Sequence, residues 1–261
     1  MDFQSLTALV SGGARGIGFA TVVALGRRGA AVVITDVDEP RLAEAARLLA
    51  AQDIPALAGR ADVRSMDDCR AAVAQAIERF GRLDLLVNNA GISMVSRFDQ
   101  CAPEPCQRLI EVNVVGSINL TLAAVEEIKK NHGSIVFISS VSGIRAIPEG
   151  SIYSASKAAL RSLADSLRIE LAPAGVHVGC ICPGFTFSDP AKTVMRGDGA
   201  PRPINRPPHD TPEGVAAAIV KMIERRRREM VLTPMGRLTA ILQRISPALL
   251  ERLLRGRTLQ N

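Results

Sequence analysis

The sequence predicts an α/β fold built on one doubly wound parallel sheet with helices on both faces. Three observations lead to this prediction. Short apolar runs typical of buried strands recur along the chain, stretches with helical periodicity separate them, and no internal repeat or low-complexity linker interrupts the alternation. A chain of 261 residues with 47% hydrophobic content is long enough for one large core, so we expect a single domain.

Five apolar runs predict the strands of this sheet. They cover residues 6–10, 31–35, 83–88, 134–139 and 176–181. Between the first three of these runs, apolar residues recur every three or four positions, which predicts helices over 18–29, 39–52 and 65–81. Ligands of such sheets bind beyond the carboxyl ends of the strands, so the site is expected at that edge.

Two regions depart from the alternation. From Pro183 to Pro212 the chain carries seven of its 15 prolines, which predicts a long irregular loop, and such loops are more often functional than not. Beyond Met230 the sequence predicts one short strand and then two helical segments separated by Pro247.

The composition argues against several classes of protein. Five cysteines are an odd number, and Cys180 and Cys182 fall on one predicted strand, so we expect a reducing, cytoplasmic compartment. No stretch repeats a zinc-ligand spacing, so no metal site is predicted. No run of about 18 apolar residues occurs and the first residues lack a basic leader, which indicates neither a membrane span nor secretion.

The chain is basic, with a net charge of +6 and an isoelectric point near 9.4. Such a charge is compatible with nucleic acid, with an anionic membrane surface, or with a basic soluble enzyme. Aromatic residues make up only 3%, and no helix-turn-helix, zinc-finger or base-stacking pattern occurs. We therefore predict no nucleic-acid partner.

A glycine-rich turn follows the first predicted strand. In "TALVSGGARGIG", which ends at Gly18, Gly12, Gly16 and Gly18 precede or open the first predicted helix. Glycines there permit a tight turn and let backbone N–H groups approach a pyrophosphate. A plain loop would explain the glycines alone, but Asp36 closes the second strand, where a carboxylate accepts from an adenosine ribose 2′-hydroxyl. The sheet is therefore predicted to be a Rossmann-type dinucleotide-binding fold.

The order of these glycines differs from G-x-G-x-x-G and resembles the signature of the short-chain dehydrogenase/reductase family. "SGGARGIG" is similar to the family's T-G-x-x-x-G-x-G, with Ser11 in the place of threonine. Further motifs follow in the family's order: "ADV" at 61–63, "NNAG" at 88–91, "VNVVG" with Asn113, "ISSVSG" with Ser140, "YSASK" with Tyr153 and Lys157, and "PGFTFS" at 183–188. The resemblance covers about residues 5–232.

The resemblance implies a nicotinamide dinucleotide as cofactor. Its expected contacts are Gly12, Arg15, Gly16, Ile17, Gly18, Asp36, Asp62, Val63, Asn89, Ala90, Gly91, Tyr153, Lys157, Pro183, Gly184, Phe185, Thr186 and Ser188. Asp62 would touch the adenine, and the 183–188 loop would cap the nicotinamide. Arg15 resembles the basic residue that NADP-dependent members place near the 2′-phosphate, but the Asp36 carboxylate would repel that phosphate, so NAD is predicted over NADP.

Four residues are candidates for catalysis: Asn113, Ser140, Tyr153 and Lys157. Tyr153 and Lys157 are four positions apart and share one helix face. A free tyrosine has a pKa of about 10, but a nearby ammonium and an oxidised nicotinamide favour the phenolate, which can exchange a proton with an alcohol or ketone. Ser140 would hydrogen-bond the reacting oxygen. By resemblance, Asn113 would hold a water that links Lys157 to solvent.

Each candidate also has a purely structural alternative. The chain's only tyrosine could be a half-buried packing residue, Lys157 a solvated helix lysine, and Ser140 a cap or turn residue. Ser139 and Ser142 compete with Ser140, which is preferred because it keeps the family's usual distance to the tyrosine. The joint occurrence of the set in the family's order favours the catalytic interpretation.

The substrate is predicted to be a mainly apolar alcohol or ketone. The loop at 184–211 offers Phe185, Phe187, Pro190, Val194 and Met195 with few hydrogen-bonding groups. We expect the substrate contacts to be Ser140, Tyr153, Phe185, Phe187 and Met195. The alternative is that the apolar loop residues only pack the loop itself.

The C-terminal segment is a separate feature, so we divide the chain into a dinucleotide-binding and catalytic domain at 1–235 and an amphipathic helical extension at 236–261. Leucines and isoleucines recur at helical spacing in this extension among arginines, and "RRRR" at 225–228 precedes it. The extension would suit an anionic bilayer surface, as a peripheral contact. Alternatively, it covers the substrate cleft or a subunit interface of a homodimer or homotetramer.

The resulting functional prediction is an NAD(P)(H)-dependent oxidoreductase that interconverts a secondary alcohol and a ketone, on an apolar or lipid-like substrate. One alternative is an NADPH-dependent reductase of 3-keto-lipids. A second, of a different class, is a dinucleotide-sensing regulatory protein on the same fold. The substrate and the physiological direction are left open by the sequence.

Overall fold

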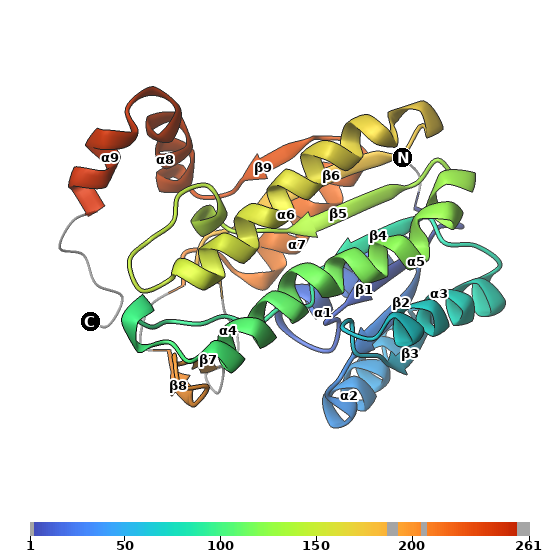
Figure 1. Cartoon of the computed structure of the whole chain (residues 1–261). Coiled ribbons are helices and arrows are strands. Elements are labelled where there is room, and N and C mark those ends of the chain that lie inside the picture. The colour runs from blue at the N-terminus through green and yellow to red at the C-terminus, as the bar shows by residue number, and fades with distance from the viewer. Residues whose placement is uncertain (1–2, 187–192, 205–207, 255–261) are drawn as a thin grey trace.

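The computed structural model describes residues 3–186, 193–204 and 208–254. Its centre is a seven-stranded, fully parallel sheet in the order β3-β2-β1-β4-β5-β6-β9 (Figure 1). These strands are β1 (Thr7–Ser11), β2 (Ala31–Asp36), β3 (Ala56–Arg60), β4 (Leu85–Asn88), β5 (Ser134–Ile138), β6 (His177–Cys182) and β9 (Glu229–Val231). The strand order reverses beside β1, as the doubly wound prediction requires.

Helices cover both faces of the sheet. In chain order the helices of the described residues are α1 (Gly16–Gly26), α2 (Glu39–Ala50), α3 (Met66–Phe80), α4 (Pro103–Ile110), α5 (Gly116–Lys130), α6 (Ser151–Glu170), α7 (Pro212–Glu224), α8 (Pro234–Ile245) and α9 (Pro247–Leu254). Helices α1, α2 and α7 cover one face and α3, α5 and α6 the other. A π-helical turn, Glu111–Val115, joins α4 to α5, and short 3₁₀ turns lie at Phe98–Gln100, Val141–Gly143 and Ala172–Ala174.

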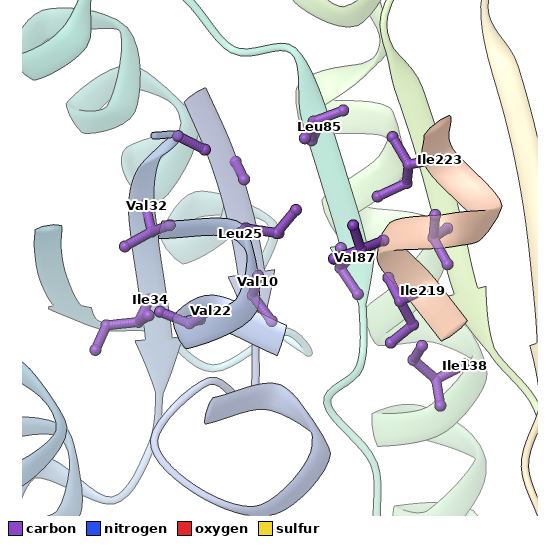
Figure 2. Close-up of a cluster of buried hydrophobic side chains, with 14 of the residues drawn as sticks. Val10, Val22, Leu25, Val32, Ile34, Leu85, Val87, Ile138, Ile219 and Ile223 are labelled. Atoms are coloured by element: carbon purple, nitrogen blue, oxygen red, sulfur yellow. The ribbon is translucent and has the colours of Figure 1, made fainter. Parts of the chain in front are cut away.

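Alternation along the strands produces two hydrophobic cores, one on each face. Val10 of β1 belongs to the first core, with α1, α2 and α7, whereas its neighbour Leu9 belongs to the second, with α3, α5 and α6. Figure 2 shows the first core, where Val22 and Leu25 of α1 lie over Val10 and the neighbouring strands. The sheet is therefore buried on both faces, which explains why its strands are near-continuous apolar runs.

Local signals in the sequence set several helix boundaries. The Ser65 hydroxyl accepts from the N–H of Asp68 at 3.1 Å and caps α3, which ends at Gly81 in the left-handed conformation, φ +79°. Thr211 and Thr233 cap α7 and α8 in the same way, each followed by a proline at the first helical position. The capping side chains and the prolines that follow them thus set where α7 and α8 begin.

The structure confirms the predicted fold class and differs from the sequence prediction in two elements. Strand β3 was not predicted, because "ALAGR" is short, contains small residues and lies half-exposed at the sheet edge. The 184–211 loop was predicted to be irregular, but it contains an antiparallel hairpin of β7 (Thr193–Met195) and β8 (Pro201–Pro203). The short final strand and the two helices on either side of Pro247 are present as predicted.

The continuous helix Pro103–Lys130 is, by length and composition alone, apolar enough to cross a bilayer. No other helix in the described ranges meets that measure. Its inner side packs into the second core through Leu120, Ala124 and Ile128, each 1% exposed or less. Core helices of soluble folds meet the same measure, so this property is weak evidence for a span.

Candidate active site

Glycine shapes the turn between β1 and α1. Gly12 and Gly16 have φ angles of +62° and +56°, a conformation that L side chains rarely adopt. A Cβ on Gly18 would lie 2.2 Å from the Gly12 carbonyl oxygen, so only glycine lets α1 start so close to the turn. A Cβ on Gly16 would meet no described atom within 4 Å, which leaves open space at the start of α1. Arg15 is exposed beside it and provides no side-chain cap.

The segment after β4 clamps this turn. Asn89 Nδ2 donates to the carbonyl oxygens of Ser11 and Gly12, at 2.8 and 2.9 Å. The Ser11 hydroxyl in turn accepts from the N–H groups of Asn89 and Ala90, both at 3.1 Å. Ser11 was not predicted as a site residue. It is a positioning residue for the turn, and the signal for it was the hydroxyl retained at the family's threonine position.

Asp36 ends β2 next to the same turn. Its carboxylate accepts from the N–H groups of Val37 at 2.8 Å, Asp38 at 3.2 Å and Ala14 at 3.4 Å. These three backbone donors fix the carboxylate at the edge of the glycine turn. The residue that sequence reasoning assigned to the ribose thus lies beside the residues assigned to the pyrophosphate.

Asp62 is held by an ion pair that the sequence did not predict. Arg64 Nε lies 3.0 Å from Asp62 Oδ2, and this hydrogen bond holds the pKa of the Asp62 carboxyl below its usual value. The next residue, Val63, is buried, and its carbonyl oxygen accepts from Asn119 Nδ2 at 3.1 Å. A partner that contacts the Asp62 carboxylate must share it with the Arg64 guanidinium.

Ser140, Tyr153 and Lys157 come together from the end of β5 and the first turns of α6. Ser140 and Tyr153 lie close enough for the Ser140 side chain to lower the pKa of the tyrosine. Lys157 is 5% exposed; its Nζ donates to the carbonyl oxygen of Ile138 at 2.9 Å and lies 5.8 Å from the centre of the Tyr153 ring. The three side chains that the motifs singled out therefore form one cluster.

The structure distinguishes the three neighbouring serines. Ser139 is 2% exposed and donates its hydroxyl proton to the Lys157 carbonyl oxygen at 2.7 Å. Ser142 contributes its backbone N–H, which donates to the Ser140 hydroxyl at 3.2 Å. Of the three serines, Ser140 is the one that lowers the pKa of Tyr153, and the Ser142 N–H orients its hydroxyl group.

Burial raises the pKa of Tyr153 above its ordinary value of 10.0, and the hydrogen bond with Ser140 opposes this rise. The sequence argument named the Lys157 ammonium as a cause of a lowered pKa. In the structure desolvation is the larger effect, so the protein alone favours the neutral phenol.

Asn113 lies in the π-helical turn and is fully buried. Its Nδ2 donates to the carbonyl oxygen of Ile92 and to the Ser156 hydroxyl, both at 3.0 Å, and its Oδ1 accepts from the N–H of Ile92 at 2.8 Å. Both amide protons are used, and Oδ1 keeps one lone pair. A Cβ on Gly91 would lie 3.1 Å from this Oδ1 and 3.4 Å from Lys157 Nζ, so the two atoms lie around the same glycine.

The loop after β6 begins beside the cluster. The Pro183 carbonyl oxygen accepts from the N–H of Val141 at 3.1 Å, and the Gly184 N–H donates to Asp210 at 2.8 Å. Phe185 is half-buried and Thr186 is buried. Phe187, Ser188 and Pro190, which the sequence also assigned to this loop, lie outside the described residues.

The hairpin of β7 and β8 is docked on the segment after the 88–91 motif. Met195 exchanges backbone hydrogen bonds with Ser93 and Val95, both at 2.9 Å. Beside it lies a cavity of about 450 Å³, lined by Val95, Ser96, Gln100, Arg196, Gly197, Asp198 and Arg202. This lining is mostly polar, and neither Phe185 nor Met195, which the sequence assigned to the substrate, belongs to it. Arg196 and Arg202 were missed because the hairpin that carries them was not predicted.

The family model for short chain dehydrogenases matches residues 6–198, well over half of the chain. The chain belongs to the short-chain dehydrogenase/reductase family. The glycine turn, the Asn89 clamp and the Ser140, Tyr153 and Lys157 cluster are thus the family's motifs as this member folds them. The open space at Gly16, the uncapped start of α1 and the Asp36 carboxylate fit a dinucleotide, with the glycine turn and Asp36 as its holding residues.

Similar proteins are found in several bacteria. Oxidoreductase UcpA of Salmonella typhimurium is 35% identical over 223 residues, 85% of this chain and 81% of that protein. Ketoacyl reductase HetN of a Nostoc species is 31% identical over 256 residues, 95% of this chain and 88% of that protein. A Burkholderia phymatum short-chain dehydrogenase/reductase, solved with NAD, has the same fold, with a TM-score of 0.85, 24% identity and 96% of each chain covered.

Proposed function

We propose that this oxidoreductase interconverts a secondary alcohol and a ketone with NAD(H) as cofactor. The observation that carries the proposal is the cluster of Ser140 and Tyr153 with the buried Lys157, whose Nζ lies 5.8 Å from the centre of the tyrosine ring. A regulatory protein that only senses a dinucleotide has no need for this set, which favours an enzyme over a sensor. We also propose a cytoplasmic location, which the odd number of cysteines favours.

The three side chains divide the work of proton transfer. Ser140 holds the oxygen of the reacting group, and Tyr153 exchanges a proton with it, as phenol toward a ketone and as phenolate toward an alcohol. The Lys157 ammonium, held against the Ile138 carbonyl, stabilises negative charge on the tyrosine. The nicotinamide, when bound, gives or takes the hydride. In the oxidation direction Tyr153 thus takes the O–H proton of the alcohol, while a bound nicotinamide would take the hydride from its C–H bond.

The preference for NAD rests on Asp36. Its carboxylate is fixed by three backbone N–H groups at the edge of the glycine turn, and a 2′-phosphate there would set two negative charges against each other. Arg15, the competing signal for NADP, is exposed and does not cap α1. The fixed carboxylate is the stronger of the two signals.

We expect Asp36→Ala to weaken NADH binding by about tenfold or more, because a charged hydrogen bond is lost, and to relax discrimination against NADPH. Fluorescence titration of both reduced dinucleotides measures the two affinities. Asp67→Ala serves as the control, because the Asp67 side chain is 94% exposed on α3. A parent protein that binds NADPH more tightly than NADH would contradict the assignment.

For the substrate we propose a lipid-like molecule with a polar or anionic end. Half-buried Phe185 next to the cluster supports the apolar part. The cavity beside the hairpin, with Arg196, Arg202 and Ser96 in its lining, supports the polar end. The Nostoc relative is named a ketoacyl reductase, which favours ketoacyl compounds as the second candidate. This candidate corresponds to the alternative expected from the sequence, an NADPH-dependent reductase of 3-keto-lipids. A screen of hydroxy- and keto-lipids, steroids and acyl thioesters, followed by dinucleotide absorbance, separates these possibilities.

A further inference from the structure

The strongest feature outside the candidate active site is the outer surface of α8 and α9. Among the residues that the structure describes, half of the large apolar side chains that are exposed lie on these two helices. They are Met235, Leu238, Ile241, Ile245, Leu249 and Leu253, and their exposed fractions run from 47% to 76%. A patch of this kind on a soluble protein marks a surface that meets a partner.

The helix α8 is oriented with its apolar side outward. Its contact with the rest of the protein uses small and polar residues: Gly236 packs against Val141, where a Cβ would lie 2.7 Å from Val141 Cγ2, and Gln243 accepts from Arg145 at 3.4 Å. Leu238, Ile241 and Ile245 recur at helical spacing on the opposite side. A helix that served only to cover the protein would bury these residues and expose Gln243.

This orientation decides against one alternative from the sequence. A roof over the substrate cleft would turn the apolar stripe toward the protein, and the exposed fractions of Ile241 and Ile245, 54% and 76%, show that it faces away. Figure 1 shows α8 and α9 together at one end of the molecule, beyond the layers of the sheet and its helices. The stripe is therefore accessible to something much larger than a substrate.

The charge around the stripe indicates what it meets. Residues 234–261 contain five arginines and one glutamate, so most of the chain's net charge of +6 lies in this segment. Arg237, Arg244 and Arg252 are exposed beside the apolar side chains. A contact with a second copy would bring two sets of these arginines to one interface with only one glutamate from each copy to offset them, and like charges there would repel. An anionic surface with an apolar interior can bury the apolar side chains and pair with the arginines beside them.

We propose that α8 and α9 bind the surface of a bilayer that contains anionic lipid, with Leu238, Ile241, Ile245, Leu249 and Leu253 in the acyl boundary and the arginines at the headgroups. This inference concerns a surface and does not depend on the identity of the reaction.

The test is co-sedimentation of the full-length protein with vesicles of phosphatidylcholine alone or with about 30% phosphatidylserine, a content that gives the negative surface potential required. Binding to the anionic vesicles is expected, and it should weaken as added salt screens the arginines. Ile245→Glu is expected to lower the binding at least tenfold. Ile169→Glu on α6 is the matched control, because Ile169 is 77% exposed and Ile245 is 76% exposed.

The double variant Arg244→Gln and Arg252→Gln tests the charged border, with an expected loss of about fivefold per arginine. Equal binding by the Ile245→Glu variant and the parent would overturn the proposal, as would no binding of the parent to anionic vesicles. If the parent protein does not bind vesicles but forms a dimer, and Ile245→Glu dissociates that dimer, the proposal is overturned and the partner of this surface is a second copy of the chain. Circular dichroism of each variant shows whether it is folded.

Discussion

At the scale of single residues, the site combines one titratable phenol with groups that control its proton. Burial favours the neutral form of Tyr153, and Ser140 lowers the pKa of the phenol. The Ile138 carbonyl oxygen holds Lys157, whose Nζ lies 5.8 Å from the centre of the tyrosine ring. The order of these effects is testable because the chain has one tyrosine and no tryptophan.

We expect the ultraviolet titration of Tyr153 to show a midpoint above pH 10.0 in the protein alone, because burial penalises the phenolate. Ser140→Ala should move the midpoint higher, since the hydrogen bond with Ser140 lowers the pKa. Saturation with the oxidised dinucleotide should move it lower, because that cofactor brings a positive charge. A midpoint below 10 in the protein alone would show that desolvation does not dominate.

At the scale of elements, the sequence predicted best what depends on short-range patterns. Strands β1, β2, β4, β5 and β6 of the central sheet, the glycine turn and the Tyr153–Lys157 spacing are all set within a few residues of chain. Strand β3 and the β7–β8 hairpin were missed, because their residues are small or proline-rich and gain their structure from pairing with neighbours. The Asp62–Arg64 ion pair and the polar cavity were missed because they depend on side-chain placement in the fold.

The turn between β1 and α1 gives a prediction that separates folding from binding. Gly18→Ala should lower the free energy of unfolding by about 3 kcal/mol or more, because its Cβ would overlap the Gly12 carbonyl oxygen at 2.2 Å. Gly16→Ala should cost about 1–2 kcal/mol, since it meets backbone strain but no neighbouring atom. Gly16→Ala should nevertheless weaken dinucleotide binding, because its methyl group enters the open space at α1.

Thermal unfolding and NADH titration of the two variants measure these effects. The account requires the larger stability loss in Gly18→Ala and a clear affinity loss in folded Gly16→Ala. If Gly16→Ala binds NADH with the same affinity as the parent, the cofactor does not occupy the space at the start of α1.

At the scale of the whole molecule, the pH dependence of stability has a contribution from His177 at the start of β6. Its ring nitrogens lie 3.2 Å from Ser134 Oγ and 3.0 Å from the carbonyl oxygen of Arg227. Burial lowers the pKa of His177 below 6.5; the hydrogen bond to the Arg227 carbonyl opposes this, and the charges of Arg226 and Arg168 add to it. The folded protein therefore binds fewer protons at this site than the unfolded chain.

Because the folded pKa is depressed, the stability contributed by neutral His177 is complete above the unfolded pKa of about 6.5. It is lost as the pH falls from there through the folded pKa. We expect the free energy of unfolding, measured by urea denaturation, to fall over this range, and the fall to be smaller in His177→Gln. An identical pH profile for the two proteins would assign the acid sensitivity to other groups.

The central claim is that this chain is an oxidoreductase in which Tyr153 transfers the proton. The most direct measurement is the turnover of Tyr153→Phe and the parent on a substrate found in the screen, together with the NADH affinity of both. The account predicts a loss of about 100-fold or more in kcat, with dinucleotide affinity nearly unchanged, since only the proton-transferring group is removed. A folded Tyr153→Phe protein that turns over within tenfold of the parent would contradict it.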